Sequence, residues 1–487
     1  MAPDRNRHAV RKEDNVVKRG LSMSTQSLLT NLREGADMGW RSQASLTMRL
    51  GAPAVLAQLS SFAMQFIDAS MVGHLGALPS AAVGLMGSST WLLTGLLTVA
   101  AMGFSVQVAH LIGGGRHSEA RPLFRQSISA VLLFSVIVAL FGASISGHLP
   151  VWLGGGDEIA HDSSVYFLVY SLFLPALQMH VLAGCMLRCG GDMKTPSLVS
   201  VVMCLMDVIL NFFLIFPGRE LSISPGVDLY IPGAGLGVLG AALGTGVAEL
   251  LSGAFLLWYA ARRSDMLSLK GIGGCQIPDA AVLRKALRIS LPMGGEKIMF
   301  CSAYIMLTAI VAPLGVDAIA ANALAVTAES LCYMPGFGIG EAATTLVGQA
   351  IGAGRRDVAR RLAWMNVGLG VTAMTLTGAA MYLFAPFIMS LMTNVDSIAS
   401  LGVMCLRMEA FAEPMYAASI VAYGVFVGAG KTLVPSLMNL GSIWIVRIPL
   451  AAWLAIQMGL RGVWLAMVLE LCFRGVVFLW RLARTSF

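Results

Sequence analysis

Residues 113–142 read GGGRHSEARPLFRQSISAVLLFSVIVALFG, and residues 352–381 read GAGRRDVARRLAWMNVGLGVTAMTLTGAAM. Each stretch joins a glycine- and arginine-rich turn to an apolar run of about twenty residues, the length with which an α-helix crosses a lipid bilayer. Gly113 and Arg116 of the first stretch match Gly352 and Arg355 of the second, 239 positions later. The two stretches therefore predict repeated membrane-spanning helices.

The same offset of 239 relates many other positions, which indicates an internal duplication. It places Leu75 on Leu314, Pro175 on Pro414, and Gly191 on Gly430. One ungapped offset held over more than 120 residues is not expected between unrelated helices. Because an even number of helices per half keeps both halves in the same orientation, the pseudo-twofold axis should run along the membrane normal.

The composition favours lipid as the solvent of this chain. Hydrophobic residues make up 57% of its 487 residues, and charged residues only 12%, about half the share of a soluble protein. We expect an all-α polytopic membrane protein with about 12 transmembrane helices in two six-helix bundles. Four prolines, Pro53, Pro175, Pro292 and Pro414, fall inside these helices and predict bends. The expected spans begin near residues 46, 79, 123, 162, 195, 235, 284, 317, 357, 396, 432 and 459.

The sequence divides into four parts. We predict a polar cytoplasmic tail at 1–45, a first bundle at 46–262, a cytoplasmic linker at 263–283 and a second bundle at 284–487.

Basic residues gather on one side of this topology. With the N-terminus inside, the outer loops hold only two of them, Arg219 and Arg461. The inner loops hold Arg116, Arg121, Arg125, Lys194, Arg262, Arg263, Lys270, Arg284, Lys285, Arg288, Arg355, Arg356, Arg360, Arg361 and Lys431. This asymmetry follows the positive-inside rule, so the net charge of +7 indicates topology and not nucleic-acid binding. We expect a multi-pass plasma (inner) membrane protein with both termini in the cytoplasm.

Catalytic motifs are missing from the sequence. There is no HExxH or GxSxG motif, and the GxGxxG at 235–240 begins an apolar helix with no strand before it. We therefore do not expect an enzyme or an ATP-driven pump.

Four motifs resemble those of the multidrug and toxic-compound extrusion (MATE) transporters. They are FIDASMVGHLG at 66–76, LRCGGDMKTP at 187–196, MPGFGIG at 334–340 and LVGQAIGAG at 346–354. The resemblance covers roughly residues 46 to 484. It implies a twelve-helix antiporter that exports amphipathic, often cationic compounds against an inward flow of Na+ or H+.

In the first half, charged groups within the apolar runs point to a coupling site. Asp68 lies in the first helix, and Asp207 lies in the fifth with Asn211 one turn later on the same face. Buried carboxylates are costly unless they are paired or hydrated, so each is a functional candidate. Asp68 matches the first-helix acid of the resembling family. The alternative is that Asp68 and Asn211 only bond freed backbone groups.

In the second half, the candidates are Glu296, Glu329 and Glu413. Glu296 lies near the helix-seven acid of the resembling family, and Glu413 directly precedes Pro414. For Glu409 and Glu413, the alternative is a bond with Arg407 that serves the structure only.

These residues predict a cation-coupled antiporter that works by alternating access and exports amphipathic, cationic organic compounds. The coupling ion is H+ or Na+, with possible Na+ ligands at Asp68, Asp207, Asn211 or Glu296, and no other cofactor is expected. We expect small-molecule substrates, membrane lipid around the chain and a monomer. The main alternative is a flippase for a lipid-linked oligosaccharide, which predicts a strongly cationic cavity or additional helices; a receptor or membrane enzyme is more distant.

Overall fold

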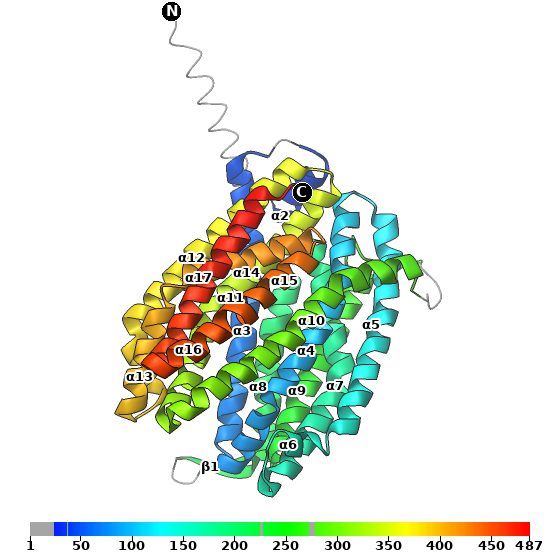
Figure 1. Ribbon diagram of the computed structural model, residues 1–487. Helices are drawn as coiled ribbons and strands as arrows, with labels where there is room; N and C mark the ends of the chain where they lie inside the picture. The colour runs from blue at the N-terminus through cyan, green and yellow to red at the C-terminus, as the bar shows by residue number, and fades with distance from the viewer. Residues whose placement is uncertain (1–23, 37, 225–226, 272–277) are drawn as a thin grey trace, which may run out of the picture.

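Two helical bundles pack side by side in the computed structural model, which describes residues 24–36, 38–224, 227–271 and 278–487 (Figure 1). The first half contains α2 (Thr25–Arg33), α3 (Trp40–Gly73), α4 (Ala77–Gly113), α5 (His117–Ile145), α6 (Leu149–Trp152), α7 (Asp157–Cys189), α8 (Lys194–Ile215), β1 (Pro217–Ser224), β2 (Val227–Ala234) and α9 (Gly237–Arg262). The second half contains α10 (Ala280–Val311), η1 (Ala312–Leu314), α11 (Val316–Gly352), α12 (Arg356–Met392), α13 (Asp396–Glu409), α14 (Glu413–Gly428), α15 (Leu433–Gly441), η2 (Ser442–Arg447), α16 (Ile448–Met458) and α17 (Leu460–Arg484).

Most of these helices are long and apolar enough to cross a membrane. Ten helices of the described residues qualify, and the bent pair α13 and α14 makes an eleventh span. α11 has 37 residues, but Glu329 and Glu341 interrupt its apolar sequence. Counting α11, the helices fit six spans per half, as the sequence predicts.

The duplication governs where helices begin. The starts of α4 and α11, α5 and α12, α7 and α13, and α8 and α15 are each separated by 239 residues. For α9 and α17 the offset falls to 223, because the first half contains the antiparallel hairpin of β1 and β2. We did not predict this hairpin from the sequence.

Both ends of the described chain lie on one face of the molecule, which we call the termini face, and the hairpin lies on the opposite hairpin face (Figure 1). The first span begins at Trp40, earlier than the expected 46, and α2 also falls within the expected tail. This difference has a physical cause: Ser24 caps α2 by accepting from the Ser27 amide, and its buried leucines provide an apolar face.

The four prolines lie at different positions in their helices. Pro53, Pro175 and Pro292 lie within single continuous helices. Pro414 instead lies in the first turn of α14, where its missing amide costs no hydrogen bond. The chain bends there by 59°.

The two halves meet at the termini face through equivalent helices, α4 and α11. A Cβ on Gly113 would overlap the Gln349 carbonyl, and a Cβ on Gly352 would overlap the His110 carbonyl. His110 and Gln349 are themselves related by the 239-residue offset. The His110 Nε2 lies 2.8 Å from the Gly428 carbonyl oxygen. Close backbone contact, with the His110 side chain beside it, therefore closes the molecule at this face.

Candidate functional site

A buried acid–amide cluster joins α3 to α8 in the first half. The Asn211 Nδ2 donates to the Asp68 Oδ1 at 2.8 Å and to the Asp207 Oδ2 at 3.2 Å. Asp207 and Asn211 are fully buried, and Asp68 is partly buried. The structure thus brings together all three first-half residues that the sequence singles out.

Close packing against α9 fixes the Asn211 side chain. Gly244 of α9 lies against the Asn211 amide oxygen, and any Cβ at position 244 would overlap that oxygen. A glycine is therefore needed for α9 to approach the cluster. This contact leaves the amide nitrogen directed at the two carboxylates.

The cluster has free oxygen atoms that suit a small hard cation or a shared proton. The Asp207 Oδ1 and the Asn211 Oδ1 are buried without a hydrogen-bond partner. Like other hard cations, Na+ binds carboxylate and amide oxygens. Two neighbouring carboxylates can also share one proton. Within the described residues, no group of three or more His, Cys, Asp or Glu side chains could hold a metal ion.

A second polar pair lies near this cluster. We did not predict this pair from the sequence. The His180 Nδ1 of α7 lies 3.6 Å from the Glu249 Oε2 of α9 and 2.8 Å from the Ser252 Oγ. Both side chains are largely buried, at 14% and 12% exposed. Glu249 and Ser252 share a face of α9, but nothing in the sequence shows that α7 covers that face.

The second half has its own acid–amide pair. Glu296 of α10 accepts hydrogen bonds from the Asn439 Nδ2 and the Tyr423 hydroxyl, both at 2.7 Å. Asn439 lies 143 residues after Glu296, the separation of Asn211 from Asp68. Both halves therefore join an acid of their first helix to an amide of their fifth.

The two pairs lie at different depths. Glu296 follows Asp68 by 228 residues rather than 239. The difference of eleven residues is about three helical turns, or about 16 Å along the helix axis, on nearly the same helix face. The second pair is therefore displaced toward the termini face relative to the first.

Other second-half acids are buried in a separate region of charged side chains. Glu409 and Glu413 are fully buried and Glu329 is 6% exposed. All four carboxylate oxygens of Glu409 and Glu413 are buried without hydrogen-bond partners. The structure does not place these acids in the Glu296 pair.

Two arginines beside this region pair with an acid that sequence reasoning missed. The Arg447 Nε lies 3.1 Å from one Glu470 oxygen, and the Arg474 Nη2 lies 2.6 Å from the other. Ser442 also donates to Glu470. Because Glu470 and Arg474 are four residues apart, their pairing was readable from helical spacing.

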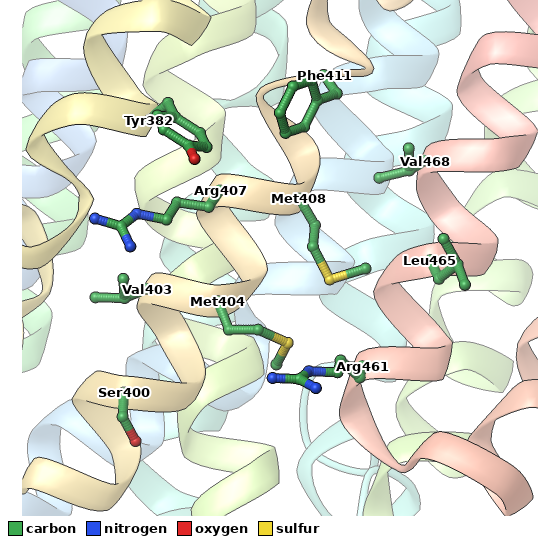
Figure 2. Close-up of a pocket in the computed structure, with 10 residues that line it drawn as sticks. All are labelled: Tyr382, Ser400, Val403, Met404, Arg407, Met408, Phe411, Arg461, Leu465 and Val468. Carbon is green, nitrogen blue, oxygen red and sulfur yellow. The ribbon is translucent and has the colours of Figure 1, made fainter.

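Arg407 does not bond Glu409 or Glu413, contrary to the structural alternative considered for them. It lies on the outer surface, with its guanidinium 5.4 Å from the centre of the Tyr382 ring. Figure 2 shows Arg407 and Arg461 among the residues that line a shallow surface groove of about 600 Å³. Residues 404, 407, 408 and 411 share one outward face of this helical region, whereas Glu409 and Glu413 point inward.

Glu341 of α11 joins the two halves. Its Oε2 lies 3.5 Å from the Arg188 Nε of the first half. The Gln58 Nε2 donates to its Oε1 at 3.0 Å. This ion pair adds to the contacts that close the termini face.

These features define a membrane transporter built from two duplicated lobes with carboxylates inside. The model of the MatE family matches residues 53–213 and 292–453. The chain belongs to this family of transporters.

Relatives and solved structures agree with that assignment. A probable multidrug resistance protein NorM of Thermotoga maritima is 24% identical over 432 residues, covering 88% of this chain and 90% of the relative. The multidrug resistance protein MdtK of Yersinia enterocolitica is 25% identical, covering 88% and 93%.

Solved structures support the same fold at lower identity. A MATE crystal structure in complex with MaL6 matches with a TM-score of 0.83 at 20% identity, covering 93% of this chain and 98% of the other. An outward-facing multidrug resistance MATE family transporter matches with a TM-score of 0.81 at 20% identity, covering 91% and 96%. The fold expected from the sequence is confirmed.

Proposed function

We propose that this protein is a cation-coupled antiporter that exports amphipathic organic cations by alternating access, with Asp68, Asp207 and Asn211 as its coupling site. The observation that carries the proposal is the amide of Asn211, which joins two carboxylates inside a membrane-spanning bundle. Such groups are costly in lipid and are characteristic of ion pathways.

The coupling follows from competition for the carboxylates. A proton or Na+ bound at Asp68 and Asp207 neutralises charge that a cationic substrate needs for binding. Binding of one therefore favours release of the other. Movement of one charge across the membrane contributes about 2.3 kcal/mol per 100 mV.

The second acid–amide pair supports a second cation-binding position in this proposal. Glu296 and Asn439 lie about 16 Å nearer the termini face than their first-half equivalents. Sites at two depths suit a carrier that takes its coupling ion from one side and releases it to the other. Glu413 and Glu329 remain candidates for a proton-carrying role, because both are buried and the neighbouring Arg447 forms its ion pair with Glu470.

Orientation and surroundings complete the proposal. The basic loops favour a cytoplasmic termini face in an inner membrane, and in this orientation the contacts between α4 and α11 would close the cytoplasmic side. One chain contains both halves of the site, so a monomer suffices. The names of the relatives support small organic molecules as substrates.

The test is efflux of a fluorescent cationic dye from liposomes that contain purified protein, under an imposed H+ or Na+ gradient. Asp68→Asn should abolish gradient-driven efflux, because it removes a charged oxygen from the Asn211 amide. Glu296→Gln, tested in parallel, reports on the second pair. Asp157→Asn, which changes an exposed acid at the start of α7, is the matched control and should behave as wild type.

The outcomes separate the alternatives. The gradient that drives efflux identifies the coupling ion, and loss only in Glu296→Gln moves the coupling site to the second half. Efflux that neither gradient nor either mutation affects contradicts the coupling assignment. A protein that moves no dye, but moves a lipid-linked oligosaccharide between leaflets, is a flippase.

A further inference from the structure

The short helix α2 lies across the termini face, where the two halves meet, and forms part of the contact between them (Figure 1). Its residues Leu28, Leu29 and Leu32 are buried, with 0–2% exposed. They belong to one apolar cluster with Met193 of the first half and Val347 of the second. α2 therefore has apolar partners in both halves. This packing is separate from the contact between α4 and α11.

Arg33, at the end of α2, bonds to both halves at once. Its Nη2 donates to the Gly190 carbonyl of the first half at 3.0 Å. Its Nε and Nη2 both lie 3.2 Å from the Gln349 Oε1 of the second half. A rigid guanidinium can reach two acceptors in this way, whereas an ammonium acts as a point charge.

Arg33 also orients a second bond between the halves. Gln349 is fully buried, and its Nε2 donates to the Cys189 carbonyl at 2.6 Å. Because Arg33 holds the Gln349 oxygen, the amide nitrogen must face Cys189 of the other half. The side chain of Gln349 is thus held at both of its polar atoms.

The electrostatics of this junction favour a cation. α7 ends at Cys189 and α11 ends at Gly352, and helix C-termini carry partial negative charge. A second arginine, Arg355, donates from its Nη1 to the Ala36 carbonyl at 2.8 Å and to the Asn31 carbonyl at 3.3 Å. Two arginines, Arg33 and Arg355, therefore hold the C-terminal end of α2.

We propose that α2 is a latch for the cytoplasmic side, in which Arg33 is a positioning residue that stabilises the closed contact between the two halves. When the halves separate toward the cytoplasm, Arg33 can keep Gly190 or Gln349, but not both. The bond between Gln349 and Cys189 breaks in the same step. Release of α2 is then part of each opening, and its strength sets the balance between the two states of the carrier. This inference rests on the alternating access of the proposed function, but not on its coupling ion.

The test is the distance between spin labels at Ser118 and Asp357, measured by double electron–electron resonance with the native cysteines replaced. These exposed positions are related by the 239-residue offset and lie at the starts of α5 and α12 on the termini face. Arg33→Ala should raise the ratio of long to short distances about tenfold, which corresponds to a loss of about 1.4 kcal/mol. Arg33→Lys, which keeps the charge without the fork, should give a smaller rise.

Matched controls are available on the same segment. Arg41→Ala removes an exposed arginine whose guanidinium lies over the neighbouring Trp40 ring, and it should leave the distances unchanged. A chain that begins at Met23 keeps α2 and should match wild type. A chain that begins at Met38 lacks α2 and should open like Arg33→Ala.

Unchanged distances in both Arg33→Ala and the chain from Met38 would overturn the latch. A change equal to that of Arg41→Ala would also overturn it. Thermal unfolding of each variant reports on folding separately. Arg33→Ala should shift the distances, while its melting temperature should be close to that of Arg41→Ala. The distances require no ion gradient, so failure of cation coupling leaves this result readable.

Discussion

At the scale of single residues, the first-half cluster depends on one glycine. We expect Gly244→Ala to reduce coupled efflux strongly and to destabilise the protein by about 1–3 kcal/mol, the usual cost of overpacking. The added methyl group must displace the Asn211 oxygen and so turns the amide away from the carboxylates. Thermal unfolding and dye efflux measure the two effects. Gly87→Ala, in α4 with open space around its Cα, is the control; equal effects at both positions would contradict this prediction.

Also at the residue scale, two buried glutamates of the second half should respond differently to the same substitution. Glu470→Gln leaves Arg447 and Arg474 without a counter-charge, and breaking a buried ion pair costs about 3–5 kcal/mol. Glu409→Gln loses no hydrogen bond within the protein and should change the melting temperature little. Thermal unfolding of the two purified variants decides. Equal losses of stability would mean that Glu409 has a partner of its own.

At the scale of elements, the hairpin of β1 and β2 should be dispensable for folding. The second half makes the equivalent connection between α16 and α17 through Gly459 alone, whose φ of 59° favours glycine. We expect a variant in which a single glycine replaces residues 217–234 to fold with a melting temperature near that of wild type. Retained folding with lost efflux would instead assign the hairpin a role at the outer opening.

The helices can be predicted well from the sequence for two reasons. Each span must be apolar enough for lipid, and the internal duplication repeats the helix starts in both halves. The offset of 239 residues anticipated the shared starts of α4 and α11 without any knowledge of contacts. The Asp68–Asn211 pair was also within reach, because the spacing of Asp207 and Asn211 placed them on one face and the family resemblance pointed to Asp68. Two other pairs could not be predicted, because each depends on which helices face each other. They are Glu470 with Arg447 and Glu249 with His180. α2 was missed because nine residues with three leucines do not resemble a span.

At the scale of the whole molecule, the pseudo-twofold symmetry is broken at two places that matter for transport. The acid–amide pairs of the two halves differ in depth by about three helical turns. α2 packs once across the symmetric junction and has no counterpart in the described second half. A symmetric carrier would have equivalent sites and an unbiased junction, so these departures would give the two states of the proposed carrier different energies, while the ion gradient would still set the direction of transport.

The latch should also be insensitive to pH over the working range of a carrier, unlike the carboxylate site. Burial lowers the pKa of Arg33 from its ordinary value to about 10. Because the docked arginine binds its proton less tightly than the released one, docking would strengthen only as pH rises through 10. Below about pH 9 both states remain charged, so the opening caused by Arg33→Ala should be constant.

Spin-label distances of wild type and Arg33→Ala between pH 6 and pH 9 provide the measurement. For each protein the readout is the ratio of open to closed populations. The ratio for Arg33→Ala divided by the ratio for wild type should stay constant, even where the individual populations change with pH. His117 of α5 is the titratable neighbour whose charge interacts with Arg33, so the same pair is measured in a His117→Gln background. Burial and the nearby arginines hold the pKa of His117 below its ordinary value, and its protonated ring would repel Arg33. A ratio that falls toward pH 6 and is restored in that background would therefore assign the effect to His117. A ratio that collapses in both backgrounds would show that the bonds of Arg33 do not set the balance of the carrier.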